Sequence, residues 1–332
     1  MIILMMRRSF KKKALSSCQF VTKSHSRCHY LDKSSMVYYY KAFGLTIESP
    51  LACPELLPAT GAPDVVIRYG AVPDSLESVQ QKGGYYQVNS GAFLLKARAV
   101  AKFLVTGGEQ IIIERAPGAQ DNEVRLFLLG SAFGALLQQR GLLPLHGCAI
   151  QVDGEAAVFV GPSGCGKSTL AGALHQRGYR VLADDVSVIS FSAAGAPLVL
   201  SAYPQLKLWV DTLKVLEKNS EELRRIRSGL DKFGLPLGEG FSNDSPPLKK
   251  VYELTVSDSQ DLGLTSLQGM DRLSVLVRHT YRLQFLAGTS GKKNHLEQCA
   301  QAVRYCQVSR LVRPRSPVRL EELADLVEKD WA

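Results

Sequence analysis

The residues best suited to chemistry lie in one glycine-rich stretch near the middle of the chain. That stretch consists of Gly161, Pro162, Ser163, Gly164, Cys165, Gly166, Lys167, Ser168 and Thr169. It fits the pattern G-x-x-x-x-G-K-[ST], whose backbone N–H groups surround the phosphates of a nucleoside triphosphate. In such a loop the lysine reaches the β- and γ-phosphates, and the serine hydroxyl is a Mg²⁺ ligand. The stretch therefore predicts ATP and Mg²⁺, with Lys167 on the phosphates and Ser168 on the metal.

The segments on either side of this loop have the patterns that such a loop needs. Ala156–Val160 is a short apolar run, typical of a buried strand. Lys167–Arg177 has the apolar spacing of a helix, and Gly178 is placed to end it. A strand, a glycine loop and a helix follow one another, so a glycine turn that binds nothing is the less favoured interpretation.

Two adjacent carboxylates follow the next predicted strand. Tyr179–Ala183 is strand-like, and Asp184 and Asp185 come directly after it. An acid at the end of a strand beside a phosphate loop is suited to holding Mg²⁺. Neighbouring side chains of an extended chain point in opposite directions, so the two acids are expected to have different roles. One can contact Mg²⁺ through water, and the other can accept the proton of an incoming hydroxyl as a general base.

A histidine precedes the loop by one predicted hairpin. Pro144–Val152 has the composition of a strand, and Asp153-Gly154 is a tight-turn dipeptide that leads into Ala156–Val160. This order places His146 near the nucleotide. A single histidine in a strand is more often structural, and only its position favours a part in catalysis.

The net charge of +9 is concentrated at the N-terminus. Residues 1–36 contain eight Lys or Arg and one Asp, so they carry +7, and the remaining 296 residues carry about +2. A nearly neutral body offers no broad surface for a nucleic-acid backbone, so no nucleic-acid partner is predicted. Residues 1–36 are expected to be a disordered basic extension, with a transit peptide or a start site that belongs at Met36 as alternatives.

Apolar runs and cysteine spacing argue against a membrane span and against a disulfide framework. The longest uncharged apolar run, Leu126–Leu137, covers 12 residues, fewer than a helix needs to cross a bilayer. The seven cysteines are odd in number and include no C-x-x-C pair, which favours a reducing compartment over a zinc site. We therefore predict a cytoplasmic protein, and a homo-oligomer is compatible with the sequence.

Ahead of the loop, residues 37–116 are predicted to form a small β-rich lobe. Aromatic and β-branched residues dominate this segment. Two hairpins are expected in it, Tyr85–Val88 with Ala92–Leu95 and Phe103–Val105 with Gln110–Glu114.

Residues 117–332 are predicted to form the domain that contains the loop. Its first helix is expected from Glu123 to about Arg140, capped by Asp121-Asn122 and apolar nearly all round, hence buried. Asp211–Arg227 is predicted as a helix, and Gly229–Pro247 as a long loop that can act as a mobile lid. Further elements are expected at Leu198–Leu208 and Lys249–Thr255 (extended) and at Met270–His279, His295–Arg304 and Leu320–Asp330 (helical).

Residues 142–190 resemble the HPr kinase/phosphorylase family, bacterial serine kinases that act on a small phosphocarrier protein. The resemblance is carried by LHGCAIQVDGEAAVFVGPSGCGKSTLAGALHQRGYRVLADDVSVI. A strand histidine, the loop, a helix ending in Arg-Gly and a strand ending in Asp-Asp occur there in the family's order. The same core is similar to ATP-dependent phosphoenolpyruvate carboxykinase. The resemblance implies an α/β fold with the P-loop kinase core that the two families share, preceded by the β-rich lobe.

Carried over by position, the resemblance implies that Asp184 is the general base, supported by His146, and that Asp185 lies near the metal. The family has Glu directly after the loop serine, where this chain has Thr169. The family's E-[IV]-R-G-L-G signature, tied to its phosphorylase activity, has no match here. The resemblance is therefore to a divergent member of the family.

These features predict an ATP-dependent kinase that transfers the γ-phosphoryl group to a hydroxyl, expected to be a serine, of a protein, a peptide or a small molecule. One alternative is a switch or assembly factor that hydrolyses nucleotide with water as sole acceptor, although the N-K-x-D and L-S-G-G-Q motifs are absent. Another is carboxykinase-like chemistry on a small acid, which needs Lys and Arg ligands that the sequence does not identify.

Candidates for a transition-state arginine are Arg224, Arg225, Arg227, Arg278, Arg282, Arg310, Arg313, Arg315 and Arg319.

Overall fold

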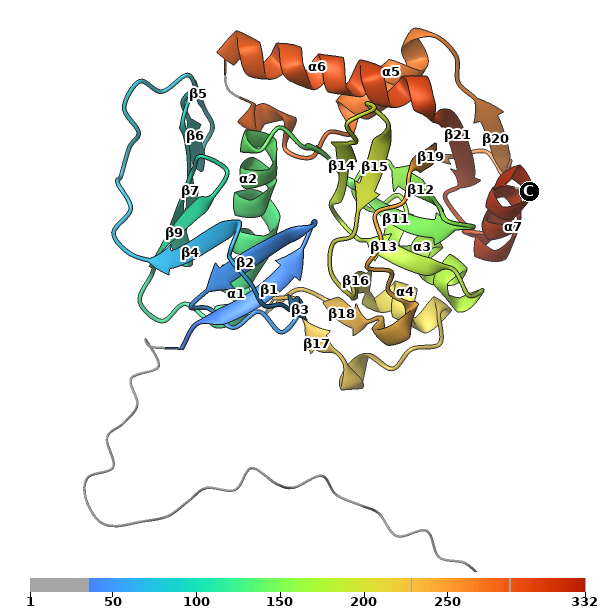
Figure 1. Cartoon of the computed structure of the whole chain (residues 1–332). Coiled ribbons are helices and arrows are strands. Elements are labelled where there is room, and N and C mark those ends of the chain that lie inside the picture. The colour runs from blue at the N-terminus through green and yellow to red at the C-terminus, as the bar shows by residue number, and fades with distance from the viewer. Residues whose placement is uncertain (1–35, 228, 287, 332) are drawn as a thin grey trace, which may run out of the picture. The chain divides into compact units, whose positions relative to one another are not determined.

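A nine-stranded sheet and a six-stranded sheet, with two three-stranded sheets beside them, make up the β-structure of the described chain (Figure 1). The computed structural model describes residues 36–227, 229–286 and 288–331. The expectations for residues 1–35 lie outside this part. The architecture is mixed α/β, as the sequence predicts.

The nine-stranded sheet is built from residues 38–115 in the order β3-β1-β2-β4-β9-β8-β7-β6-β5. Both predicted hairpins are confirmed as the antiparallel pairs β6–β7 and β8–β9. The pairs β2–β4 and β4–β9 are parallel. The strands are β1 (Tyr38–Ala42), β2 (Leu45–Ser49), β3 (Leu57–Pro58), β4 (Val65–Tyr69), β5 (Gln81–Lys82), β6 (Tyr86–Val88), β7 (Ala92–Ala97), β8 (Ala101–Thr106) and β9 (Gln110–Arg115).

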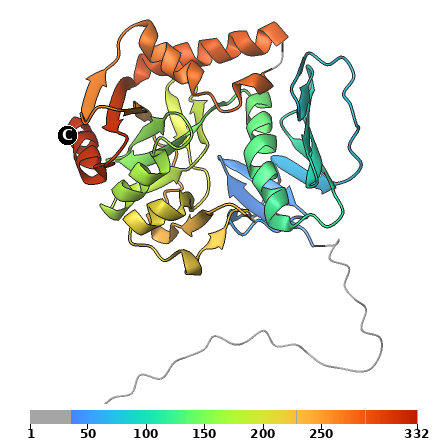
Figure 2. The same ribbon diagram turned by 180° about the vertical axis from the view of Figure 1, so that it is seen from behind.

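A buried helical segment follows this sheet, as its apolar composition predicts. It consists of α1 (Asp121–Phe127), a π-helical turn η2 (Leu128–Ala132) and α2 (Phe133–Gln139). The helix begins at Asp121, so Gln120 precedes it and Asp121-Asn122 is not the cap. Seen from behind, the segment lies between the nine-stranded sheet and the rest of the molecule (Figure 2).

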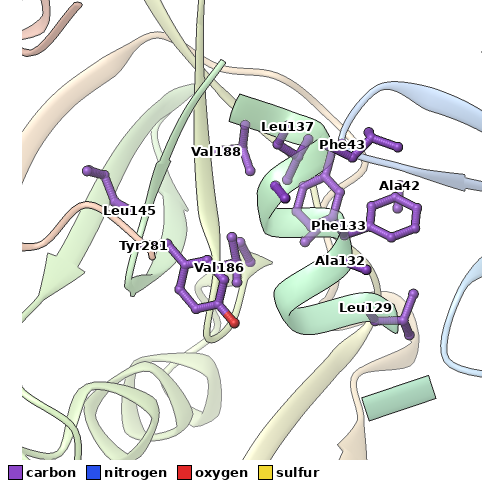
Figure 3. Packing of buried hydrophobic residues seen from close by; sticks show 14 of the residues in the cluster. Ala42, Phe43, Leu129, Ala132, Phe133, Leu137, Leu145, Val186, Val188 and Tyr281 are labelled. Atoms are coloured by element: carbon purple, nitrogen blue, oxygen red, sulfur yellow. The ribbon is translucent and has the colours of Figure 1, made fainter. Parts of the chain in front are cut away.

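Side chains of this helical segment join the nine-stranded sheet to the remainder of the fold. Phe133 lies beside Phe43 of the β1–β2 turn, with ring centroids 6.3 Å apart (Figure 3). Tyr281 approaches the same helical segment at Gly134. A Cβ added at Gly134 would lie 2.8 Å from the Tyr281 ring, so glycine permits this close approach. Because the contacts are apolar and continuous, the two parts share one core.

The six-stranded sheet has the order β13-β11-β12-β19-β21-β20. Its strands are β11 (Gly147–Val152), β12 (Glu155–Val160), β13 (Arg180–Ala183), β19 (Leu248–Ser257), β20 (Gly263–Ser266) and β21 (Gln307–Pro314). The pairs β12–β19 and β19–β21 are parallel. One face packs on α3 (Lys167–Gln176) and α7 (Leu320–Trp331), and the other on α5 (Met270–Arg278) and α6 (Gly288–Tyr305).

Two small sheets flank the predicted carboxylates. The first has the order β10-β14-β15 and consists of β10 (Leu143–Leu145), β14 (Ser187–Phe191) and β15 (Pro197–Leu200). The second has the order β16-β18-β17 and consists of β16 (Gln205–Trp209), β18 (Lys232–Pro236) and β17 (Arg224–Arg225). The predicted strand Pro144–Val152 is thus divided at His146, since β10 and β11 belong to different sheets.

The predicted helix Asp211–Arg227 is wrong beyond its first turn and a half. Helix α4 (Val210–Val215) ends where Glu217 takes a positive φ of 53°, and a short 3₁₀ turn (Ser220–Glu222) and β17 follow. The predicted lid at Gly229–Pro247 is also wrong in part, because it contains β18. Phe233 of β18 is buried against Leu206 and Leu208, so packing into the core overrides the loop-like composition.

No helix within residues 36–227, 229–286 and 288–331 is long and apolar enough to cross a bilayer. The five cysteines in this part are free thiols, and all are buried.

Candidate active site

The glycine-rich loop connects β12 to α3, and its backbone conformation requires glycine at both ends. Gly161 has a φ of 150°, and a Cβ there would lie 2.5 Å from the carbonyl oxygen of Leu254. Gly166 has a φ of 103° directly before α3 begins. Arg313 of β21 fastens the loop, because its Nε donates to the Cys165 carbonyl oxygen at 2.8 Å. The loop is therefore held closely between β19 and β21.

Lys167 extends from the first turn of α3 back along the loop. Its Nζ donates to the carbonyl oxygens of Gly161 and Pro162, each at 2.9 Å, and lies 3.4 Å from Nε2 of His146. The residue is only 6% exposed, yet it lines the cavity above the loop. An ammonium group held here can contact phosphate oxygens that bind the loop.

His146 contacts both the lysine and the acid pair. Its Nδ1 lies 3.1 Å from the carbonyl oxygen of Asp185. Burial and the nearby Lys167 lower the pKa of His146 below its usual value, although Asp185 opposes them. Neutral imidazole with the proton on Nδ1 satisfies both contacts, because Nδ1–H then donates to Asp185 and Nε2 accepts from Lys167.

Asp184 is buried and fully engaged in hydrogen bonds. Its Oδ1 accepts from the Ser168 hydroxyl at 2.8 Å and from the Cys148 thiol at 2.8 Å. Its Oδ2 accepts from the backbone N–H of Lys207 at 2.5 Å. The residue is 4% exposed and does not line the cavity. An incoming hydroxyl therefore has no approach to this carboxylate.

Asp185 has the opposite environment. Its positive φ of 71° turns the side chain into the cavity, where Oδ2 accepts from Nζ of Lys207 at 3.2 Å. Burial alone would raise the pKa of Asp185, but Lys207, Lys232 and His146 outweigh it and hold that pKa well below its usual value. A strained non-glycine backbone at such a position is typical of functional sites.

The two carboxylates face different ways, although the left-handed backbone at Asp185, and not an extended chain, separates them. Their contacts, however, are the reverse of the roles that the family resemblance implies. Asp184 meets Ser168, the residue predicted to bind Mg²⁺, whereas Asp185 lies open beside His146. The difference arises because Asp184, directly after β13, bonds Ser168 of α3, and the unusual backbone of Asp185 turns that residue away.

The residue types around Ser168 fit Mg²⁺. A hydroxyl and a buried carboxylate supply the oxygen ligands that this ion prefers, and phosphate oxygens and water ordinarily complete its shell. Among the described residues, no group of three or more His, Cys, Asp or Glu side chains could hold a metal by itself. The site therefore suits an ion that arrives with a nucleotide.

The cavity above the loop has a volume of about 260 Å³. Its polar wall residues include Lys167, Asp185, Lys207 and Lys232. Its apolar wall residues are Leu208, Trp209, Val215, Val318, Leu320 and Leu323. The polar wall suits phosphates and a reacting group, and the apolar wall suits the flat base of a nucleotide.

Sequence reasoning missed three residues of this cavity. Lys207 is buried within the apolar run Leu206–Leu208, and a lysine inside such a strand is a signal that could have marked it. Burial alone would lower the pKa of Lys207, but Tyr203 and Asp185 keep it well above the usual value. Lys232 and Trp209 come from segments whose pairing the sequence did not reveal. Arg313 was one of nine candidate arginines, and its contact with the loop distinguishes it.

A second ionic cluster lies under the loop and holds the elements around it. The buried carboxylate of Glu253 on β19 is 3.0 Å from Nε2 of His279, 3.0 Å from Nη1 of Arg278 and 3.0 Å from Nη2 of Arg310. The carbonyl oxygen of His279 in turn accepts from the backbone N–H of His146 at 2.7 Å. Glu253 therefore fixes the end of α5 next to the site.

The Glu253→Gln variant is expected to be less stable by about 2 kcal/mol at pH 7, with a difference that shrinks in acid. The hydrogen bond from His279, together with Arg310 and Arg278, lowers the pKa of Glu253 from 4.5 to about 2. Burial opposes this shift but is outweighed. The stabilisation is complete above pH 4.5 and is lost as the pH falls toward 2, because the unfolded chain then binds the proton first. Urea unfolding of the wild-type protein and of Glu253→Gln at pH 7 and pH 3 measures the difference in the free energy of unfolding.

The exposed Glu155 provides the matched control for Glu253. Its side chain pairs with Lys249 at 3.2 Å on the surface, so Glu155→Gln should change the stability by less than about 0.5 kcal/mol at either pH. A pH-independent loss in Glu253→Gln would mean that packing, and not the charge, accounts for its effect.

No protein-family model matches the chain, and no curated protein matches it. Among solved structures, the Hpr(Ser) kinase/phosphatase from Coxiella burnetii is similar to this chain at 12% sequence identity, covering 57% of this chain and 90% of that chain, with a TM-score of 0.31. That TM-score is too low to support a conclusion on activity, so the chemistry of the site is inferred from its own residues.

Proposed function

We propose that the protein is an ATP-dependent phosphotransferase that moves the γ-phosphoryl group to a hydroxyl acceptor. The observation that carries the proposal is the meeting of Lys167, Asp185 and Lys207 around one cavity, directly above a glycine loop that opens a helix. A loop that only binds nucleotide needs no carboxylate facing that cavity. A kinase needs one to orient the acceptor and take its proton.

The nucleotide has one favourable orientation in this cavity. Its phosphates bind the loop and the N-terminus of α3, where backbone N–H groups and the helix dipole favour anions. Its base lies on the apolar wall beside Trp209 and Leu320, both of which line the cavity. The γ-phosphate then faces the polar wall, where the positive charges of Lys167 and Lys207 compensate its negative charge.

The transfer step breaks the bond between the γ-phosphorus and its bridging oxygen and forms a bond to the acceptor oxygen. The acceptor proton passes to Asp185, and ADP leaves. The depressed pKa of Asp185 suits this step, because the transition state is loose and the proton is transferred late. Neutral His146 keeps Asp185 and Lys167 in position. Ser168 and Asp184 would hold Mg²⁺, which would neutralise charge on the phosphate oxygens.

These roles lead to a wider proposal for the chain. Residues 117–332 form a P-loop kinase core of the HPr kinase and phosphoenolpyruvate carboxykinase type, and residues 37–116 form an accessory β-rich lobe. A serine of a protein, a peptide or a small molecule is the acceptor. The five buried free thiols support a cytoplasmic location.

Trp209 provides a direct test of nucleotide binding in this cavity. The sequence contains two tryptophans, so Trp331→Phe leaves Trp209, which is 45% exposed and lines the cavity, as the sole emitter. Titrating this variant with a non-hydrolysable ATP analogue and Mg²⁺ should change its emission saturably. Unchanged emission, together with no heat of binding in calorimetry, would contradict the proposal.

A further inference from the structure

A second cavity lies on the other side of Lys207 from the loop. Its volume is about 30 Å³, room for one small group. Helix α1 forms one wall, and β16, β17 and Glu55 form the others. The residues with charged or amide groups are Glu55, Asn122, Arg125, Gln205, Lys207, Arg224 and Arg225. Since Lys207 lines both cavities, the second cavity adjoins the reacting end of the first.

The charge of this second cavity is strongly positive. Arg125, Lys207, Arg224 and Arg225 face a single carboxylate, Glu55. Two of the four cations are buried, because Arg125 is 3% exposed and Lys207 8% exposed. The exposed Arg224 and Arg225 lie on β17 at the mouth. Lys207 pairs with Asp185, Arg125 with Glu55 and Arg225 with Asp231, so positive charge still exceeds the single carboxylate of the cavity lining mainly at Arg224.

Arg125 shows where that anion is missing. Its Nε donates to Oε1 of Glu55 at 2.9 Å and its Nη1 to the carbonyl oxygen of Ala52 at 3.2 Å. Its Nη2 is buried and has no hydrogen-bond partner among the described residues. The pair with Glu55 anchors α1 to the nine-stranded sheet, which explains Nε and Nη1 but leaves Nη2 without a role. Arg125 lines the cavity, and an unpartnered guanidinium N–H there is suited to an oxyanion. Oε2 of Glu55 is also buried without a partner in the described part of the chain, and it can accept from a protonated group of the same ligand.

We propose that this cavity binds a carboxylate or phosphate group of the acceptor, so that the substrate is a hydroxyl compound that also carries an oxyanion. The inference rests on the proposed function. Arg125 and Arg224 bind the oxyanion, and the hydroxyl reaches Asp185 past Lys207, whose Nζ is 3.2 Å from Oδ2 of that acid. Glu55 contributes by orienting Arg125. The β-rich lobe, whose sequence indicated no role, thus takes part in recognising the substrate.

The test uses small oxyanions as probes on the full-length protein. With the loop filled by a non-hydrolysable ATP analogue and Mg²⁺, sodium acetate and sodium sulfate are titrated at constant ionic strength, and the thermal unfolding midpoint is followed. We expect saturable stabilisation by at least one of the two, and the preferred one tells whether the group is a carboxylate or a phosphate. Arg224→Gln should weaken that binding by about tenfold or more.

Two further variants keep the test decisive. The double variant Glu55→Gln, Arg125→Met removes both partners of the buried pair and should abolish binding of the oxyanion, whereas Arg68→Gln, an exposed arginine on β4, should leave it unchanged. The absence of saturable binding of either probe to the wild-type protein would overturn the inference. It would also be overturned if Arg224→Gln and the double variant bound the probe as tightly as the wild-type protein does. The titration is repeated without nucleotide in Lys167→Met, a variant that keeps the second cavity intact. Binding of the oxyanion in this variant would show that the second cavity functions even if nucleotide binding fails.

Discussion

Replacing Lys167 by methionine is expected to lower the rate of phosphoryl transfer by about 10²- to 10³-fold or more. The lysine is 6% exposed, and its Nζ lies between the loop carbonyls and His146, where the transferred group must pass. Methionine has a similar length, so the packing under the loop is kept while the positive charge is lost. Initial rates with γ-labelled ATP measure the effect, and thermal unfolding verifies that the variant is folded.

Lys249 offers a matched control for this substitution. It is an exposed lysine on β19 that pairs with Glu155, away from the cavity. Lys249→Met should therefore keep the full transfer rate. Equal rates in Lys167→Met and the wild-type protein would show that the loop does not hold the reacting phosphates.

The Asp185→Asn variant is expected to lose about 10²- to 10⁴-fold in transfer rate without losing its affinity for the nucleotide with Mg²⁺. Asparagine keeps the shape of the side chain but cannot take up the proton of the acceptor hydroxyl.

Asp184→Asn is expected to behave differently. Because its carboxylate meets Ser168 at 2.8 Å, its loss should raise the Mg²⁺ concentration required for half-maximal rate. Titrations with Mg²⁺ at saturating ATP distinguish the two variants.

The opposite result would restore the roles implied by the family resemblance. In that case Asp184→Asn would abolish transfer at every Mg²⁺ concentration, and Asp185→Asn would only shift the requirement for the ion. Such an outcome would mean that the loop region rearranges when substrates bind, since Asp184 is buried and does not line the cavity in this structure.

Local sequence was enough to predict the loop and its neighbours. The loop has a fixed spacing of glycines and Lys167, and β12 and α3 adjoin it in the chain. The Asp184–Asp185 pair could be located because it ends the next strand. Their division of labour could not be predicted, because it depends on the positive φ of Asp185 and on the backbone N–H of Lys207. Both are properties of tertiary structure.

Residues brought to the site by distant strands were beyond the reach of sequence reasoning. Arg313 contacts Cys165 across 148 positions, and no local pattern marks such a pair. The predicted helix Asp211–Arg227 failed for a related reason, because the chain turns at Glu217 and Arg224–Arg225 then pair with β18. Hairpins such as β6–β7 were predictable because a short turn joins their strands.

The most direct measurement of the central claim follows the γ-phosphoryl group of labelled ATP. The full-length protein is incubated with labelled ATP, Mg²⁺ and a cell lysate as the source of acceptors, and the labelled products are separated and identified. The account predicts a phosphate ester on a hydroxyl compound that carries an oxyanion, formed by the wild-type protein and not by Asp185→Asn. Label found only in inorganic phosphate would identify a nucleotide hydrolase, and label remaining in ATP would contradict the account altogether.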